Sequence, residues 1–173
     1  MVEPTEPRDV LTSLERHHPE SYAWALSCCG WETHLAEDVL QTSYLKVLEG
    51  RAGFSGRSSA KTWFFGVIRR TASEFRRKAF LKRWVGLDLV QERLRDPRAG
   101  PVEDLVKAEE TTRLVRALSG LPARQREVVH LVFYEGLSIR EAGETLGISL
   151  GSARTHYQRG KKRLKALLGE EGS

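Results

Sequence analysis

The chain has 173 residues, of which 40% are hydrophobic and 29% are charged, as in folded globular proteins. This length allows one moderate hydrophobic core or two small ones. No stretch is long and apolar enough for a membrane helix, and no apolar run follows the acidic start at residues 1–4, so we expect a cytoplasmic protein. The net charge of +5 is concentrated in basic blocks at 57–83 and 154–165, with a mainly acidic segment at 86–110 between them.

Apolar residues recur at helical spacing through most of the chain, and no hairpin or alternating pattern indicates strands. A helix with Thr33 as its N-cap is predicted by the stripe Ala36, Leu40, Tyr44 and Val47. Another, capped by Ser58 or Ser59, is predicted by the stripe Phe64, Ile68, Ala72, Phe75 and Ala79.

The segment at residues 96–101 contains two prolines and cannot continue a helix. We therefore expect an all-α protein with two small helical domains, at residues 9–84 and 109–169, joined by a flexible acidic linker at 85–108.

The last third predicts a helix-turn-helix. A helix opens at Pro122 and stops near Gly136, and Ser138 with Glu141 has the spacing of a capping box for a short second helix. Gly147 permits a tight turn before a final helix at about 150–168. An amphipathic helical hairpin with an exposed basic end is the alternative. The side chains that would face base edges and phosphates are Ser152, Arg154, Thr155, His156, Arg159 and Lys162.

Several segments of this chain resemble the extracytoplasmic-function (ECF) sigma factors of bacterial RNA polymerase. Four segments resemble the fourth conserved region of that family: LPARQREV at 121–128, EGLS at 135–138, LGI at 146–148 and RGKKRL at 159–164. The segment AEDVLQ at 36–41, with Tyr44, resembles the family's polymerase-binding helix. The segment TWFFGVIRR at 62–70, with RRK at 76–78, resembles its promoter-melting segment. The resemblance covers residues 10–169 and implies a helical domain on each side of a linker.

The resemblance also implies roles for individual residues. Asp38, Gln41 and Leu45 would bind core polymerase, although a merely solvated helix face is the alternative. The loop at 54–61 would capture a base flipped out of the minus-ten element. Trp63 is either a core residue or a stacking surface for the melted strand. The full set expected to bind the minus-ten element is Arg57, Ser58, Lys61, Trp63, Arg69, Arg70, Arg76 and Arg77.

Two of the predicted DNA-contact residues differ from the pattern common in the family. Arg70 stands where the family usually has asparagine, and His156 stands where arginine is frequent. By resemblance, the acidic linker would thread toward the active centre of polymerase, and a simple soluble tether is the alternative. The C-terminal helix-turn-helix would read the minus-thirty-five duplex.

The expected function is that of a sigma factor, which binds core polymerase, recognises and helps melt promoter DNA, and initiates transcription. A separate anti-sigma factor is an expected partner by resemblance. The alternative is a helix-turn-helix regulator that never joins polymerase. We expect no enzymatic activity, because no phosphate loop, nucleophile elbow or H-E-x-x-H motif is present. We also expect no cofactor or metal, since Cys28, Cys29 and the nearby histidines lack metal-ligand spacing.

Overall fold

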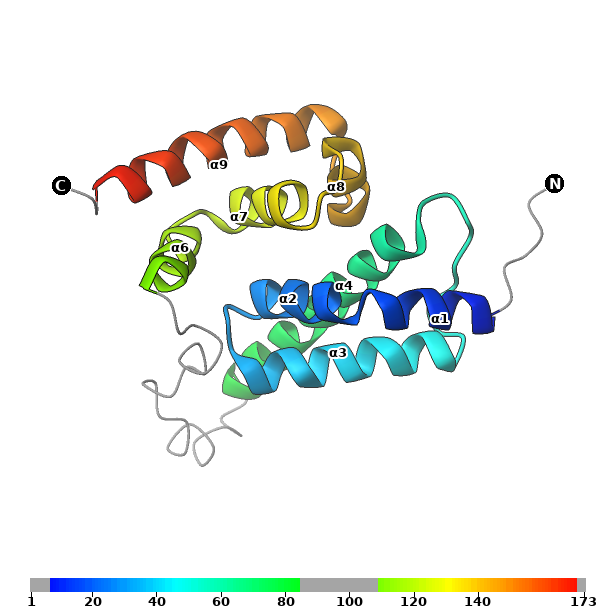
Figure 1. Cartoon of the computed structure of the whole chain (residues 1–173). Coiled ribbons are helices and arrows are strands. Elements are labelled where there is room, and N and C mark those ends of the chain that lie inside the picture. Colours follow the sequence, from blue (N-terminus) through cyan, green and yellow to red (C-terminus); the bar gives the residue numbers. More distant parts are fainter. Residues whose placement is uncertain (1–6, 85–108, 171–173) are drawn as a thin grey trace.

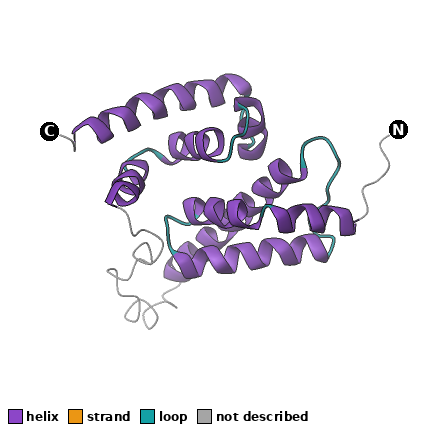
Figure 2. Cartoon of the chain, in the orientation of Figure 1, coloured by secondary structure: helices purple, strands orange, loops and turns teal. Residues whose placement is uncertain are grey.

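The computed structural model describes residues 7–84 and 109–170, and these residues form helices with no strand among them (Figures 1 and 2). The all-α prediction is confirmed, whereas the linker expected at 85–108 lies outside the described residues. In chain order, the elements are α1 (Pro7–Arg16), α2 (His18–Cys28), α3 (Thr33–Leu48), α4 (Ala60–Trp84), α6 (Glu109–Ser119), α7 (Ala123–Val129), the π-helical turn η2 (His130–Tyr134), α8 (Ile139–Leu146) and α9 (Leu150–Glu170).

In the first half, residues 7–84, helices α1 to α4 pack around Trp24. This side chain is fully buried, its indole Nε1 donates to the Phe65 carbonyl oxygen at 3.0 Å, and its ring stacks on the Phe65 ring. Ser59 caps α4 as predicted, because its Oγ accepts from the Thr62 backbone N–H at 3.1 Å. The prediction for Thr33 was wrong by one residue, since Glu32 is the N-cap of α3 and makes no side-chain cap bond.

The two predicted apolar stripes are buried to different extents. Ala36 and Leu40 are buried in α3, and Phe64, Ile68 and Ala72 are buried in α4. Burial ends along α4, where Phe75 is half-buried and Ala79 is exposed. At about 1.5 Å per residue, the 25 residues of α4 extend about 37 Å, well past the roughly 24 Å of α3. The basic end of α4 therefore projects beyond the helices that cover its start.

The second half, residues 109–170, contains the predicted helix-turn-helix formed by α8 and α9. Ser138 and Glu141 form the predicted capping box, and Gly147 ends α8 in the left-handed conformation at φ 64°. Ser149 caps α9 by accepting from the Ser152 N–H at 3.1 Å. Gly160 lets α9 pack closely on α7, because a Cβ at this position would lie only 2.6 Å from Val129 Cγ2.

The two halves share one buried cluster, and α6 to α9 lie as a layer over α2 and α4 (Figure 1). Thr145 Oγ1 in α8 donates to the Thr62 carbonyl oxygen in α4 at 3.3 Å. Trp31, whose backbone has a positive φ of 70°, packs against both this cluster and the smaller one around Leu118. Nothing in the sequence predicted this contact. The residues that the second half contributes to the shared cluster are Val128, Leu131, Leu137, Ala142 and Leu146.

Candidate nucleic-acid interfaces

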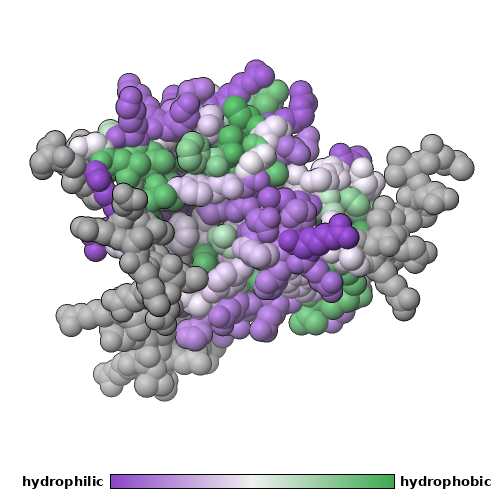
Figure 3. All heavy atoms as spheres, in the orientation of Figure 1, coloured by the Kyte–Doolittle hydropathy of each residue, from purple (hydrophilic) through white to green (hydrophobic). Residues whose placement is uncertain are grey.

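Helix α9 carries most of its predicted contact residues on its outer side, along the top of Figure 3, where hydrophilic side chains dominate. Ala153 and Gly160 are buried on the opposite side, against the rest of the second half. His156 differs from the others because it is half-buried, and its Nδ1 has no hydrogen-bond partner in the structure. The predicted residues that are exposed are Ser152, Arg154, Thr155, Arg159 and Lys162.

The capping box fixes the start of α8 and therefore the turn that presents α9. Glu141 accepts from the Ser138 backbone N–H at 2.8 Å and from the Ser138 hydroxyl at 2.7 Å. These two hydrogen bonds, the backbone one most strongly, lower the pKa of Glu141. The arrangement holds the exposed N-terminal turns of α9 on a rigid support, and a helix presented in this way fits the major groove of duplex DNA.

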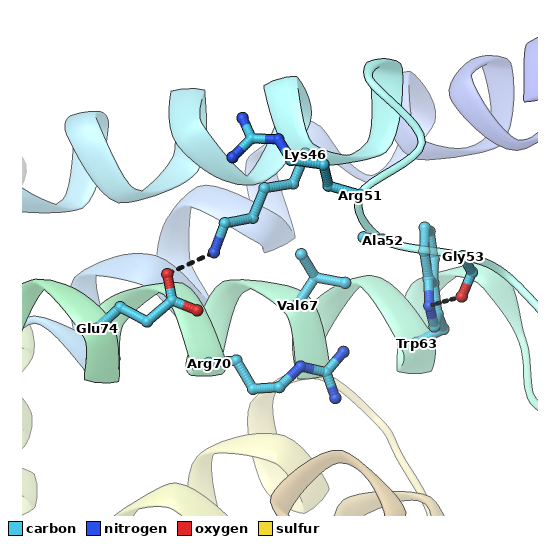
Figure 4. A pocket seen from close by; sticks show the side chains of 8 residues that line it. All are labelled: Lys46, Arg51, Ala52, Gly53, Trp63, Val67, Arg70 and Glu74. Carbon is cyan, nitrogen blue, oxygen red and sulfur yellow. Dashed lines mark hydrogen bonds and ion pairs between the residues drawn. The ribbon is translucent and has the colours of Figure 1, made fainter.

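A pocket of about 530 Å³ lies between the end of α3 and the start of α4 (Figure 4). Lys46 Nζ donates to Glu74 Oε2 at 2.7 Å across it, and Trp63 Nε1 donates to the Gly53 carbonyl oxygen at 3.0 Å. Arg70 extends from α4 and is exposed. The residues that line the pocket are Lys46, Arg51, Ala52, Gly53, Trp63, Val67, Arg70 and Glu74.

The pocket combines an aromatic surface with cations, which is the pair of groups that binds an unpaired nucleotide. Trp63 is half-buried and also packs on Phe54, so it is a wall of the pocket rather than an interior core residue. The sequence identified Trp63 and Arg70 but missed Lys46 and Glu74. Those two residues are 28 positions apart, and no local pattern predicts that their side chains meet.

The remaining residues predicted for the minus-ten element do not share one surface. Arg57 lies in the exposed loop before α4, and its Nε donates to Ser55 Oγ at 3.3 Å. Arg76 donates to the Cys28 carbonyl oxygen at 2.9 Å, which fixes its side chain on the end of α2. Lys61 and Arg69 turn toward the second half of the molecule, where each pairs with a glutamate. Beside these, Ser58 is half-buried in the loop and Arg77 is exposed on α4.

The three residues predicted to bind polymerase are all exposed on α3. Asp38, Gln41 and Leu45 follow one another along the helix surface, and Leu45 keeps half of its surface accessible. Leu48, one turn further along, is 61% exposed. This side of α3 therefore offers an apolar strip beside polar groups, away from the core residues Ala36 and Leu40.

The two cysteines are free and do not form part of a metal site in the described ranges. Burial raises the pKa of Cys28 well above its ordinary value and raises that of Cys29 to about 12. Both thiols are therefore protonated and unreactive at neutral pH. Residues 7–84 and 109–170 contain no group of three His, Cys, Asp or Glu side chains that could hold a metal ion, and none of their helices is long and apolar enough to cross a membrane.

Comparison with known proteins assigns both halves. The family model for sigma-70 region 2 matches residues 14–84, and the model for sigma-70 region 4 matches residues 111–164. The ECF RNA polymerase sigma factor SigX of Bacillus subtilis is 36% identical over 141 residues, which are 78% of this chain and 73% of that protein. The chain belongs to the ECF sigma factor family.

Other relatives of this ECF sigma factor agree. CarQ of Myxococcus xanthus is 32% identical over 79% of this chain and 76% of its own length. The sigma factor RpoE of Bartonella quintana, in a co-crystal structure with the anti-sigma factor NepR, has the same fold, with a TM-score of 0.73, 24% identity and coverage of 94% of this chain and 98% of that one. CnrH, in a structure with the cytosolic domain of CnrY, has a TM-score of 0.65 at 21% identity, over 94% of this chain and 89% of that one.

An ECF sigma factor is a promoter-specificity subunit of RNA polymerase, so the sequence-based prediction of function is confirmed. The alternative, a regulator that never joins polymerase, is not favoured. It would account for region 4 but would leave the region 2 match over residues 14–84 without a role.

Proposed function

We propose that this ECF sigma factor reads the minus-thirty-five duplex with the outer side of α9. The observation that carries the proposal is the division of that helix into two sides. Arg154, Thr155 and Arg159 are exposed, whereas Ala153 and Gly160 are buried against the domain. Arginine can make paired hydrogen bonds to a guanine edge, and the short hydroxyl side chains can reach bases or phosphates.

The pocket beside Trp63 is proposed to receive a base that is flipped out of the single strand of the melted minus-ten element. The Trp63 ring would provide the stacking surface, and Arg70 would neutralise a neighbouring phosphate. The ion pair of Lys46 with Glu74 places both a donor and an acceptor at the pocket wall, so the edge of a captured base would meet groups of either kind. Arg57 and Ser58 would contact the same strand from the adjoining loop, and Arg76 and Arg77 would contact phosphates further along α4.

The exposed side of α3 is proposed as the surface that binds core polymerase. It combines the Leu45 and Leu48 side chains with the polar groups of Asp38 and Gln41, a mixture typical of protein interfaces. The protein would act by binding rather than by catalysis, and in the cytoplasm, where polymerase and DNA are found. A separate anti-sigma factor is proposed as its regulator, supported by the RpoE structure with NepR.

The test is transcription by core polymerase from a library of randomised promoters, with and without this chain. We expect start sites that depend on the added protein. Replacing Asp38 with Arg reverses a charge on an exposed side chain, so the fold should survive while polymerase affinity falls about tenfold or more.

The matched control is Glu37→Arg, which makes the same reversal at the neighbouring exposed position of α3, about 100° around the helix. Binding titrations of both variants against core polymerase give the comparison. Equal affinities for the two variants would remove Asp38 from the interface. Sequence-specific DNA binding without any gain in transcription would instead favour the regulator.

A further inference from the structure

The pocket beside Trp63 is lined by more cations than acids. Positive side chains reach it from α3, from the loop after α3 and from α4, and Glu74 supplies the only carboxylate among its lining residues. The three cations are Lys46, Arg51 and Arg70. The lining therefore favours an anion.

These cations are neutralised to different extents by the protein itself. Lys46 pairs with Glu74 at 2.7 Å, and the Lys46 side chain is only 16% exposed. Arg51 Nε donates to Glu49 Oε2 at 2.6 Å, but both side chains are more than half exposed, and an exposed ion pair of this kind is weak. Arg70 is exposed and has no carboxylate partner within the two described ranges. Two arginines at the pocket are therefore available to bind phosphate.

The pocket also has the size and the aromatic surface that a nucleotide needs. In Figure 4, the Trp63 ring stands at one end, the pair of Lys46 with Glu74 stands at the other, and the apolar Val67 side chain lies between them. An aromatic ring binds a nucleobase by stacking. The volume of about 530 Å³ falls within the roughly 300–1,000 Å³ of small-molecule sites, so the pocket can hold a base together with its ribose and phosphates.

Glu74 keeps one acceptor for the edge of such a base. Lys46 Nζ donates to Glu74 Oε2 and, at 3.1 Å, to Thr71 Oγ1, which fixes the ammonium between the two side chains. The other carboxylate oxygen, Oε1, accepts no hydrogen bond from the described residues. The exocyclic amine of adenine, guanine or cytosine can donate to this oxygen, whereas uracil has no such amine.

From these features we propose that the Trp63 pocket also binds free nucleoside triphosphates, which compete there with the promoter strand. A triphosphate carries several negative charges on one flexible chain. It therefore neutralises Arg51 and Arg70 more fully than the single phosphate between two nucleotides of a strand. The proposal rests on the function proposed above and adds a small-molecule competitor for the same pocket. In the free chain, a bound nucleotide must leave before a flipped base can enter.

Calorimetric titration of the full chain with ATP, adenosine and inorganic triphosphate tests the site. ATP should bind at least about tenfold more tightly than either fragment, because only ATP engages both the Trp63 ring and the arginines. Inorganic triphosphate that binds as tightly as ATP would reduce the pocket to a charged patch and overturn the proposal. Adenosine that binds as tightly as ATP would overturn it as well, since the arginines would then contribute nothing.

CTP and UTP form a matched pair for the role of Glu74, because their rings have the same size and only cytosine has an exocyclic amine. CTP should bind about threefold more tightly than UTP, as expected for one additional hydrogen bond to a carboxylate. Equal affinities would contradict the contact between the base and Glu74 Oε1.

Two arginine variants locate the site. Arg70 and Arg77 are both exposed on α4, but only Arg70 lines the pocket. Arg70→Gln should weaken ATP binding about fivefold, and Arg77→Gln should weaken it less than about twofold. Trp63→Leu should weaken it about tenfold by removing the stacking surface. Because Trp63 also donates to the Gly53 carbonyl oxygen, the arginine pair decides the matter if that variant unfolds. Equal losses for the two arginine variants would overturn the proposal.

Displacement of a fluorescent mixed-sequence single-stranded oligonucleotide tests the competition. At an ATP concentration about four times its dissociation constant, the apparent affinity for the oligonucleotide should fall about fivefold. Inorganic triphosphate at the same ionic strength should lower it less than about twofold. ATP that binds without displacing the oligonucleotide would overturn the competition.

The same two titrations separate a failure of this inference from a failure of the proposed function. A chain that binds the oligonucleotide but no ATP at about 10 mM would overturn the inference and leave the proposed strand site standing. A chain that binds ATP but not the oligonucleotide would instead overturn the proposed strand site, and the competition with it.

Discussion

Under the proposed function, Arg154 and Lys162 on one helix would contact DNA in different ways. Both are exposed on α9, but Arg154 lies in the first turns after the glycine at 147, and Lys162 lies more than two turns further along. A planar guanidinium can pair with a guanine edge, while an ammonium is a mobile point charge suited to phosphate. The early position therefore favours base recognition and the later one favours backbone contact.

Replacing Arg154 with Ala should cost about 1–3 kcal/mol at the preferred duplex and flatten the preference at one base position. Replacing Lys162 with Ala should weaken binding to all duplex sequences about equally. It should also reduce the slope of log binding constant against log salt concentration by roughly one. Titration of both variants against single-base duplex variants at several salt concentrations measures this difference. If Arg154→Ala keeps the base preference, then Ser152, Thr155 or His156 must carry the recognition.

At the scale of the element, the capping box of α8 links its stability to pH. Its hydrogen bonds lower the pKa of Glu141 in the folded protein. A lowered folded-state pKa adds stability above the unfolded pKa, and this stability is lost as the pH falls through the folded pKa. Ser138→Ala should therefore lower the free energy of unfolding by about 1 kcal/mol at neutral pH, with a smaller loss at a pH below the lowered pKa of Glu141.

Chemical denaturation at both pH values measures the two losses. Ser149→Ala is the matched control because it removes the cap of α9, where the third helical residue is Ser152 and no carboxylate completes a box. Its cost should change little between the two pH values. A loss at Ser138 that is equally insensitive to pH would show that the Glu141 carboxylate adds nothing to the cap.

Gly160 sets the distance between α7 and α9. A Cβ there would lie 2.6 Å from Val129 Cγ2 and 3.2 Å from the Gln125 carbonyl oxygen. Gly160→Ala should destabilise the protein by about 1–2 kcal/mol, since overpacking outweighs the better helix propensity of alanine. Gly169→Ala on the same helix, with nothing within 4 Å of its Cβ, should be neutral or slightly stabilising. Equal thermal shifts for the two variants would contradict the close packing.

The local sequence pattern predicted most helices. It also predicted a helix end correctly where a side chain or a glycine caps that end. Ser59, Ser138 and Gly147 act as their residue types indicate. Thr33 misled because α3 starts one residue earlier, without a side-chain cap. Contacts between distant residues had no such signal. Arg69 and Glu127 are 58 positions apart, so their pairing depends on how the halves pack rather than on any motif.

At the scale of the whole molecule, the shared buried cluster couples the stability of the two halves. Leu146 of α8 and Ile68 of α4 belong to the same cluster, so neither half can unfold without exposing apolar surface of the other. The free chain should therefore unfold in a single thermal transition. Calorimetry gives the check, because equal calorimetric and van't Hoff enthalpies are expected. Two resolved transitions would mean that each half is stable without the other.

The candidate sites could be predicted from the sequence only in part. The sequence placed Asp38, Gln41 and Leu45 on an exposed side of one helix, which depends on spacing alone. The family resemblance also placed Lys61 and Trp63 in one set, expected to bind the minus-ten element. In the structure, Trp63 lines the pocket while Lys61 faces Glu135, because two residues that are two positions apart on an α-helix point to nearly opposite sides, about 200° apart.

The π-helical turn η2 lies between α7 and α8 and sets the rotation of one relative to the other. Its Glu135 N–H bonds to the His130 carbonyl oxygen five residues back, so the turn holds one residue more than an α-helical turn. Each α-helical residue accounts for about 100° of rotation. Losing one residue here would let Val129 remain against α9 but would swing Glu135 away from Lys61. The length of this turn therefore sets the direction in which α8 and α9 leave α7. An insertion or deletion within it would change both the packing of α9 and the contact between Glu135 and Lys61.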